Sequence, residues 1–142
     1  MSSLISRRWP ILLLLAYALA GIATTSSLIA WGDDWAQYVM HARNLLAGVP
    51  YGNIGYLFNP DAANVGPPSY PPGLPLLLVP VMAMFGMNLI ALKVACFLCV
   101  VLSLPCMFKA FELDFGRSVA LIATILFALH DQIFGLRNSI GS

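Results

Sequence analysis

The feature that most constrains this chain is a run of twenty residues, Ile11 to Ala30, without a single charged side chain. At 1.5 Å per residue, a helix of this length measures about 30 Å, which is the thickness of the hydrocarbon core of a bilayer. Arg7 and Arg8 precede the run, and Lys and Arg concentrate on the cytoplasmic side of membrane helices. The run therefore predicts a transmembrane helix over residues 10–31 with a cytoplasmic N-terminus.

The composition as a whole indicates an integral membrane protein. Hydrophobic residues make up 60% of the chain and charged residues 9%, whereas soluble domains carry about 25% charged residues. A net charge of +1 offers no basic surface to nucleic acid, so no nucleic-acid partner is expected. A cleaved signal peptide is the alternative interpretation of the first run, because Ala18-Leu19-Ala20 resembles a cleavage site. The apolar run continues ten residues beyond that site, which favours a membrane helix.

Two later apolar segments, 88–110 and 117–135, are also expected to cross the membrane. Lys109 and Arg117 lie near their connection and place it on the cytoplasmic side. The segment 74–86 gives only about 18 Å of helix, so it is expected to dip into the outer leaflet without crossing. The sequence therefore predicts an all-α polytopic membrane protein with about three transmembrane helices and with residues 32–73 outside the cytoplasm.

The outer segment begins with an amphipathic helix that starts at Asp33-Asp34 and stops at Gly48. Apolar residues recur at helical spacing and form one stripe, which consists of Trp35, Tyr38, Val39, Ala42, Leu45 and Leu46. The opposite, polar face carries Asp34, Gln37, His41 and Asn44, and His41 is expected to be solvated there. Such a helix lies in the membrane interface. The residues after it, 49–73, form either a packed outer cap or the rim of a substrate cleft.

The Asp pair is the strongest candidate for chemistry, and three roles are open to it. A carboxylate at this position can act as a general base, bind a divalent cation or cap the start of the helix. Arg43 and Arg137 could grip a phosphate through their guanidinium groups, and each could instead be an interfacial anchor. His130 beside Asp131 could be an oriented base or a polar turn at the membrane edge. No P-loop, dinucleotide fingerprint, zincin motif or serine-hydrolase motif occurs.

A series of short motifs follows in order along the chain. The motifs are Asp34, Tyr38, the run Ala42 to Gly48, Tyr70-Pro71-Pro72-Gly73 with the short apolar helix after it, and the run Asn88 to Lys93. In order and spacing they resemble the N-terminal part of the GT-C glycosyltransferases. These are the polytopic enzymes related to protein O-mannosyltransferases and to the transferases that attach aminoarabinose to lipid A. The resemblance covers residues 9–142.

The resemblance implies inverting transfer of a sugar from a polyprenyl-phosphate donor to a lipid, glycan or protein acceptor outside the inner (plasma) membrane of a bacterium. Asp34 aligns with the family's catalytic base, and Asp33 would assist it or hold a divalent cation, the one cofactor that the residues suggest. Tyr70 could hydrogen-bond the donor phosphate without neutralising it, and Arg137 would steady the departing phosphate. Tyr38 and Arg43 complete the predicted substrate-binding residues.

Members of that family have many more helices, so the chain is expected to be an N-terminal portion that is inactive alone. The alternative function is a small non-catalytic membrane subunit that docks a partner through its outer amphipathic helix. The two hypotheses require different residues. The transferase needs Asp34, whereas the docking subunit needs the stripe of Trp35, Tyr38 and Leu45.

Overall fold

The computed structural model describes residues 2–28, 34–55, 61 and 70–140, except for the side chains of residues 2–9. Asp33, residues 29–31 of the first predicted span, and residues 56–60 and 62–69 of the predicted outer loop lie outside the described residues. The secondary structure within the described ranges is helical. The elements are α1 (Ser2–Ala23), α2 (Trp35–Ala47), α3 (Gly73–Phe85), α4 (Leu89–Phe115), α5 (Arg117–Leu129), α6 (Asp131–Gly135) and the 3₁₀ helix η3 (Leu136–Asn138).

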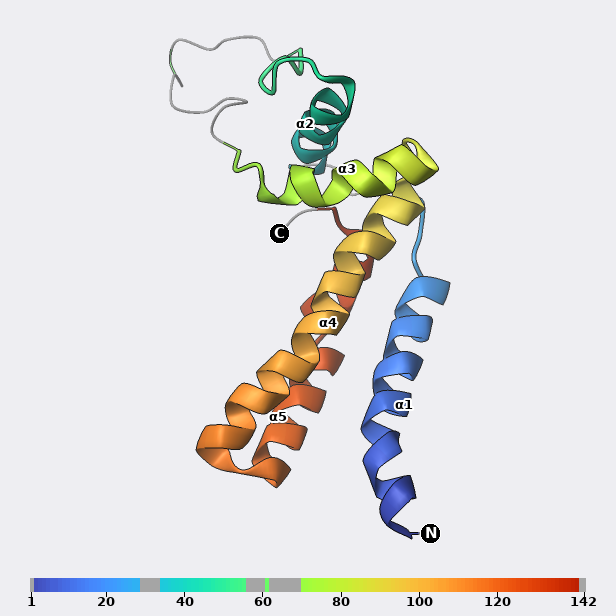
Figure 1. Ribbon diagram of the computed structural model, residues 1–142, viewed down its shortest axis with the longest axis vertical. Helices are drawn as coiled ribbons and strands as arrows, with labels where there is room; N and C mark the ends of the chain where they lie inside the picture. Colours follow the sequence, from blue (N-terminus) through green and yellow to red (C-terminus); the bar gives the residue numbers. More distant parts are fainter. Residues whose placement is uncertain (1, 29–33, 56–60, 62–69, 141–142) are drawn as a thin grey trace.

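The helices form two parts, which we call the bundle and the cap (Figure 1). The bundle consists of α1, α4 and α5, which lie lengthwise beside one another. The cap consists of α2 and α3, and α3 lies across the end of the bundle where α4 begins. The N-terminus and the turn between α4 and α5 lie at the opposite end, whereas the C-terminal segment returns to the cap. The residues around α2 and α3 therefore occupy one end of an elongated molecule.

The prediction of about three transmembrane helices is wrong. Within the described residues, only α4 is long and apolar enough to cross a membrane. A second crossing is reached only if α5 is joined to the segment Asp131–Asn138, and that pair is bent by 53°. The apolar part of α1 (Pro10–Ala23) and α3 are both shorter than a span. The described part of the chain thus offers one candidate membrane helix, or at most two.

The span predicted over residues 10–31 fails because α1 ends at Ala23. The hydroxyl of Thr24 donates a hydrogen bond of 2.7 Å to the carbonyl of Ala20, and that of Thr25 donates one of 2.9 Å to Gly21. Ser and Thr side chains compete for backbone groups in this way and favour helix ends over helix interiors. A prediction based only on the absence of charged residues misses this helix end, because Thr24 and Thr25 are uncharged.

The span predicted over residues 117–135 is interrupted at His130. Its backbone is extended, with φ −60° and ψ 132°, and it separates α5 from α6. The new helix begins at Asp131, and an acidic residue in the first turn favours a helix start. The polar triplet His130-Asp131-Gln132 therefore breaks the segment into two pieces.

Both helices of the cap lie where the sequence predicts helices. α2 occupies the segment between Asp34 and Gly48, and Gly48 adopts the left-handed conformation with φ 66° that ends many helices. α3 covers 13 residues, so it is a short helix as expected. The backbone carbonyl of Pro72 accepts from the amide of Leu76, which starts α3 directly after Pro71-Pro72.

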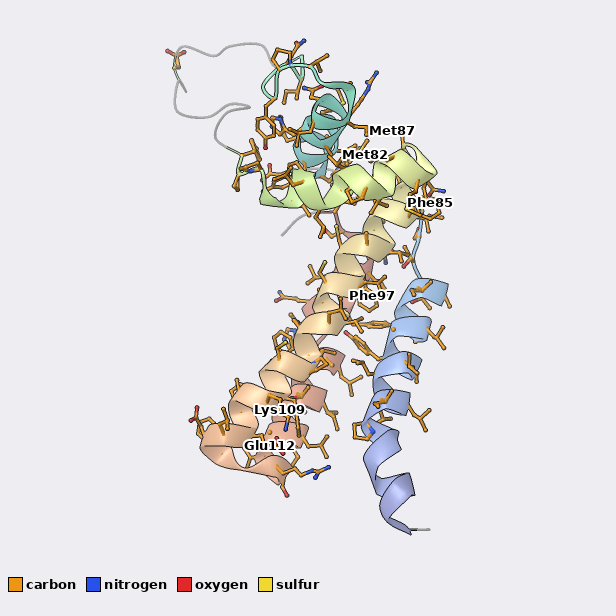
Figure 2. All side chains as sticks on the ribbon, in the orientation of Figure 1. Met82, Phe85, Met87, Phe97, Lys109 and Glu112 are labelled. Carbon is orange, nitrogen blue, oxygen red and sulfur yellow. The ribbon has the colours of Figure 1, made fainter. Side chains whose placement is uncertain are left out.

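The main apolar core joins the cap to the top of the bundle. Val39 and Ala42 of α2 pack with Leu78 and Met82 of α3, with Leu92 of α4 and with Ile140, and all six side chains are buried. Trp35 and Tyr38 pack against this cluster, so most of the predicted stripe of α2 does face apolar neighbours. Figure 2 shows Met82 at this junction and Phe85 at the far end of α3.

A second contact holds α1 against α4 within the bundle. Gly21 of α1 is buried, and a Cβ atom placed there would lie 2.0 Å from Cε1 of Phe97. Phe97 points from α4 toward α1 (Figure 2) and its ring centroid lies 5.6 Å from that of Tyr17. Nearer the cap, the ammonium group of the buried Lys93 donates to the backbone carbonyls of Ser26 and Leu28. These contacts fix the segment after α1 against the start of α4.

Candidate functional site

The structure brings two of the predicted site residues together in the cap. The phenol oxygen of Tyr70 donates a hydrogen bond of 3.0 Å to Oδ1 of Asp34, across 36 residues of sequence. Asp34 is the residue before α2, and Tyr70 precedes the Pro pair that starts α3. Asp34 is exposed and Tyr70 is half-buried. The packing of α2 on α3 therefore presents a carboxylate with a fixed phenol partner at the surface of the cap.

The structure decides against one role that the sequence left open for Asp34. Asp34 occupies the N-cap position of α2, but its side chain makes no capping hydrogen bond, and its backbone lies at φ −72° and ψ 1°. N-cap residues whose side chains cap a helix usually have β-region backbone angles. The carboxylate thus accepts a hydrogen bond from Tyr70 and does not cap α2.

Aromatic rings form a wall beside this pair. Tyr38 packs edge-on against Tyr70 with ring centroids 5.5 Å apart, and His41 lies 6.0 Å from the Tyr70 ring. His41 in turn stacks on Tyr51 at 3.9 Å with an interplanar angle of 7°. The Tyr51 hydroxyl donates a hydrogen bond of 2.9 Å to the Tyr70 carbonyl. Ring contacts therefore attach Tyr51 and Tyr70, which lie on either side of residues 56–69, to α2. The hydrogen bond between them joins these two segments to each other.

The prediction that His41 is solvated is wrong. Its exposed fraction is 0%, and that of Asn44 is 5%. The turn after α2 folds back over this face, and the Asn44 amide nitrogen donates to the backbone carbonyls of Pro50, Tyr51 and Asn53 at 2.9 to 3.2 Å. The sequence signal for this arrangement is weak, because it consists of two polar residues three positions apart and a Pro-Tyr-Gly segment that begins six residues after Asn44.

His41 presents a buried acceptor beside the Asp34–Tyr70 pair. Its Nδ1 lies 2.8 Å from the Tyr51 carbonyl oxygen, which can only accept, so Nδ1 carries a proton. In the neutral ring Nε2 then offers a lone pair, and this atom is buried without a partner among the described residues. Oε1 of Gln37, one helical turn earlier, is also buried without a hydrogen-bond partner among the described residues. These two acceptors were not singled out as site residues from the sequence.

Burial also acts on Tyr51. Removal of its hydroxyl from water raises the pKa of Tyr51 above the usual value of 10.0, and the neighbouring Tyr38 raises it further. The hydroxyl therefore remains protonated and keeps its bond to the Tyr70 carbonyl throughout the neutral pH range.

The two predicted arginines do not contact the Asp34–Tyr70 pair. Arg43 is exposed, and its nine-residue offset from Asp34 places it on the opposite side of α2 at 3.6 residues per turn. Arg137 lies in η3, where Nε donates to the Thr24 hydroxyl at 3.0 Å and the guanidinium covers the Phe134 ring at 4.2 Å. Arg137 is nevertheless near the cap, because three residues span at most about 11 Å and Ile140 belongs to the cap core.

The remaining candidates are separate from this site. His130 and Asp131 are exposed at the break between α5 and α6, and no hydrogen bond links their side chains within the described residues. No group of three His, Cys, Asp or Glu side chains that could hold a metal ion occurs in the described ranges. A cation bound by both Asp33 and Asp34 lies outside what the structure describes.

The chain was compared with protein-family models, with curated proteins and with solved structures, and none of the three comparisons finds a match. The geometry of the cap is therefore the basis for the functional proposal that follows.

Proposed function

We propose that the chain belongs to a membrane glycosyltransferase that uses a polyprenyl-phosphate sugar as donor, with the cap as part of its active site. The observation that supports this most is the bond between Tyr70 and Asp34. It pairs an exposed carboxylate with a hydrogen-bond donor next to an aromatic wall, and aromatic faces are suited to contact sugar or prenyl groups. The order of motifs from Asp34 to Lys93 that resembles the GT-C enzymes also supports it.

In the proposed reaction Asp34 acts as general base. The acceptor hydroxyl attacks the anomeric carbon, the bond from this carbon to the phosphate oxygen breaks, and the acceptor proton passes to Asp34. The polyprenyl phosphate leaves with the bonding electrons, and the configuration is inverted. Tyr70 orients the carboxylate, and Arg137 would have to leave Thr24 in order to reach the departing phosphate.

The proposed site faces the outside of a bacterial plasma membrane. α4 is long and apolar enough to cross a membrane, and four of the seven Lys and Arg residues lie at the end remote from the cap. Lys109 and Arg117 lie near the turn that is remote from the cap, and Arg7 and Arg8 are in the first turns of α1 at the same end. By the positive-inside rule this end is cytoplasmic. The cap then lies on the side where polyprenyl-linked sugars are consumed.

The described residues give no specific support to a docking subunit. That function needs the apolar stripe of α2 to be available to a partner, but Val39 and Ala42 are buried within the chain, and Trp35 and Tyr38 pack against the same core. Leu46 is the member of the stripe that remains exposed.

A binding experiment tests the proposal directly. The chain is reconstituted in lipid nanodiscs and titrated with polyprenyl-phosphate mannose that carries a photoreactive group on its sugar. We expect saturable labelling of peptides from the cap. While the Tyr70 hydroxyl donates to Asp34, its oxygen can still accept from a sugar hydroxyl, so Tyr70→Phe should weaken binding about two- to tenfold, which corresponds to one hydrogen bond. Asp34→Asn should bind the donor at least as tightly as the wild type, because it removes a negative charge close to the donor phosphate.

The matched control is Asp131→Asn, which changes the same charge on an exposed residue away from the cap. It should bind like the wild type. Labelling that does not saturate, that falls on the bundle instead of the cap, or that is the same in Tyr70→Phe would contradict the proposal.

A further inference from the structure

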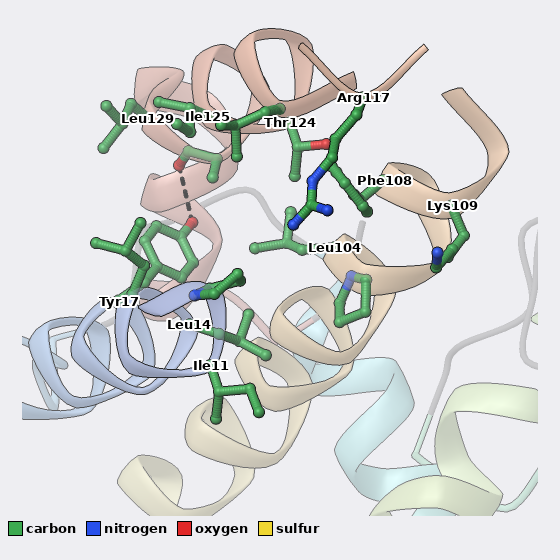
Figure 3. A pocket seen from close by; sticks show the side chains of 15 residues that line it. Ile11, Leu14, Tyr17, Leu104, Phe108, Lys109, Arg117, Thr124, Ile125 and Leu129 are labelled. Carbon is green, nitrogen blue, oxygen red and sulfur yellow. Dashed lines mark hydrogen bonds between the residues drawn. The ribbon is translucent and has the colours of Figure 1, made fainter. Parts of the chain in front are cut away.

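The bundle contains a groove that the proposed transferase does not use. It lies between α1, α4 and α5, has a volume of about 460 Å³, and falls within the range of small-molecule sites. Its walls include Leu14 and Tyr17 of α1, Leu104 and Phe108 of α4, and Leu121 and Ile125 of α5. Figure 3 shows the groove from close by. The groove begins near the turn between α4 and α5, so it lies apart from Asp34 and Tyr70.

The few polar groups inside the groove are already engaged. The Tyr17 hydroxyl donates to the Ala128 carbonyl at 2.9 Å, which is the dashed bond in Figure 3. The Thr124 hydroxyl donates to the Ala120 carbonyl at 2.8 Å. The interior therefore has no free hydroxyl proton to donate to a polar ligand, and its mainly apolar lining is suited to a hydrocarbon chain.

Two basic side chains, Lys109 and Arg117, lie at the mouth of the groove, and only one of them forms an ion pair among the described residues. Nζ of Lys109 lies 2.5 Å from Oε2 of Glu112, so its charge is balanced within the turn. Arg117 is exposed and has no ion-pair partner in the part of the chain that the structure describes. Its side chain extends from the start of α5 over the groove (Figure 3). The nearby Asp114 is exposed and does not line the groove. A guanidinium without an ion-pair partner among the described residues thus marks one end of the apolar groove.

The length of the groove matches one leaflet of a bilayer. Its lining on α5 runs from Arg117 to Leu129, and twelve residues of helix rise about 18 Å. Half of the hydrocarbon core measures about 15 Å. A chain that enters at Arg117 would therefore reach the middle of the bilayer at the end where Tyr17 bonds to Ala128.

We propose that this groove binds an anionic phospholipid, with one acyl chain between α1, α4 and α5 and the phosphate on Arg117. Basic pockets between membrane helices bind anionic head groups, and a guanidinium can hold a phosphate through two parallel hydrogen bonds. A zwitterionic lipid would bring its ammonium group close to Arg117 and Lys109, so it fits the same groove less well. The proposal is independent of the proposed transferase, because no residue is shared between the two sites.

Spin-label electron paramagnetic resonance on the reconstituted chain tests this. The chain is placed in phosphatidylcholine bilayers with spin-labelled phosphatidylglycerol or phosphatidylcholine that have identical acyl chains. We expect phosphatidylglycerol to be preferred about fivefold, because one basic group near the surface contributes about 1 kcal/mol. Arg117→Gln should abolish this preference, and 1 M salt should abolish it in the wild type as well.

A second pair of variants tests the groove itself. Leu121→Trp places a large ring in the groove and should lower the immobilised fraction of both lipids, whereas Ile122→Trp is its control, because Ile122 is 59% exposed and does not line the groove. Equal binding of both lipids to the wild type would overturn the proposal. A preference that survives Arg117→Gln, or equal losses in the two Trp variants, would overturn it as well.

Discussion

The cap and the bundle are both helical and both rich in apolar residues, but they complete their folded structures in different ways. The cap buries polar groups, His41 and Asn44, and satisfies most of them through carbonyls of its own turn. Large apolar side chains remain exposed in both parts, among them Met84 at 76% of α3 in the cap and Leu102 at 68% and Leu113 at 87% of α4 in the bundle. The polar face of α2 is therefore completed by the chain's own turn, whereas the exposed apolar surfaces of α3 and of the bundle are suited to an apolar environment.

This difference explains why the two candidate sites differ in character. In the cap, side-chain hydrogen bonds and stacked rings hold a carboxylate and a phenol in a defined geometry. In the bundle, helix packing leaves a groove whose inner hydroxyl groups donate to backbone carbonyls, and the guanidinium of Arg117 lies at its mouth. The first arrangement is suited to chemistry, and the second to holding a lipid.

The largest effect is expected when the apolar surface of the bundle is changed. Leu102 lies at the centre of α4, and Leu102→Asp should oppose membrane insertion by about 3 kcal/mol, the cost of placing Asp in the middle of a membrane helix. The inserted fraction in a glycosylation-mapping assay measures this. Leu46→Asp in the cap is the control and should leave insertion unchanged. Equal losses in both variants would remove the distinction between cap and bundle.

The next effect concerns packing inside the bundle. Gly21→Val should reduce the free energy of unfolding by about 2 kcal/mol, because its side chain would overlap the Phe97 ring. Unfolding in detergent, followed by circular dichroism, measures the change. Gly135→Val is the matched control, since a Cβ atom at Gly135 meets no atom within 4 Å. A Gly21 variant as stable as the Gly135 variant would show that α1 does not pack closely on α4.

A smaller loss is expected in the cap. Asn44→Ala removes the donor of three backbone carbonyls, of which water can reach some, so the free energy of unfolding should fall by about 1–2 kcal/mol. Asn53→Ala, at an exposed position whose carbonyl is kept, should have little effect. The same unfolding measurement by circular dichroism compares them. If the two variants lose equal stability, the Asn44 amide does not hold the turn.

The smallest effect is a dependence on alkaline pH. The pKa of Tyr51 is raised by burial, so above pH 10.0 the unfolded chain loses this proton before the folded chain does. The contribution of Tyr51 to stability is thus complete below pH 10.0 and is lost as the pH rises through the folded value. Tyr51→Phe should flatten the decline of stability in this range. An identical decline in the variant would show that the hydroxyl is not buried as described.

The sequence predicted local features of the cap well. The apolar spacing from Trp35 to Leu46 and the glycine at position 48 locate α2, and the Pro pair locates the start of α3. These signals are local, because they depend on helical periodicity and on backbone conformation. The burial of His41 and Asn44 could not be predicted, because it depends on how the turn after α2 folds back.

The sequence predicted the bundle less well, for a related reason. Counting uncharged residues extended the first helix beyond Ala23, although hydroxyl side chains end it there. The position of Arg137 on Phe134 and Thr24, away from Asp34, results from long-range packing that spacing does not reveal. The hydrogen bond between Tyr70 and Asp34 is equally long-range and was not predicted, because the resemblance to a family assigned Tyr70 to the donor phosphate.

The central claim is that Asp34 is a general base, and its removal tests this most directly. Release of sugar from polyprenyl-phosphate donors is measured with the protein expressed from its complete gene, as wild type, Asp34→Asn and Asp131→Asn. We predict that Asp34→Asn lowers turnover by about 10²–10⁴-fold while donor binding is retained, and that Asp131→Asn behaves like the wild type. Turnover of Asp34→Asn at the wild-type rate would contradict the claim.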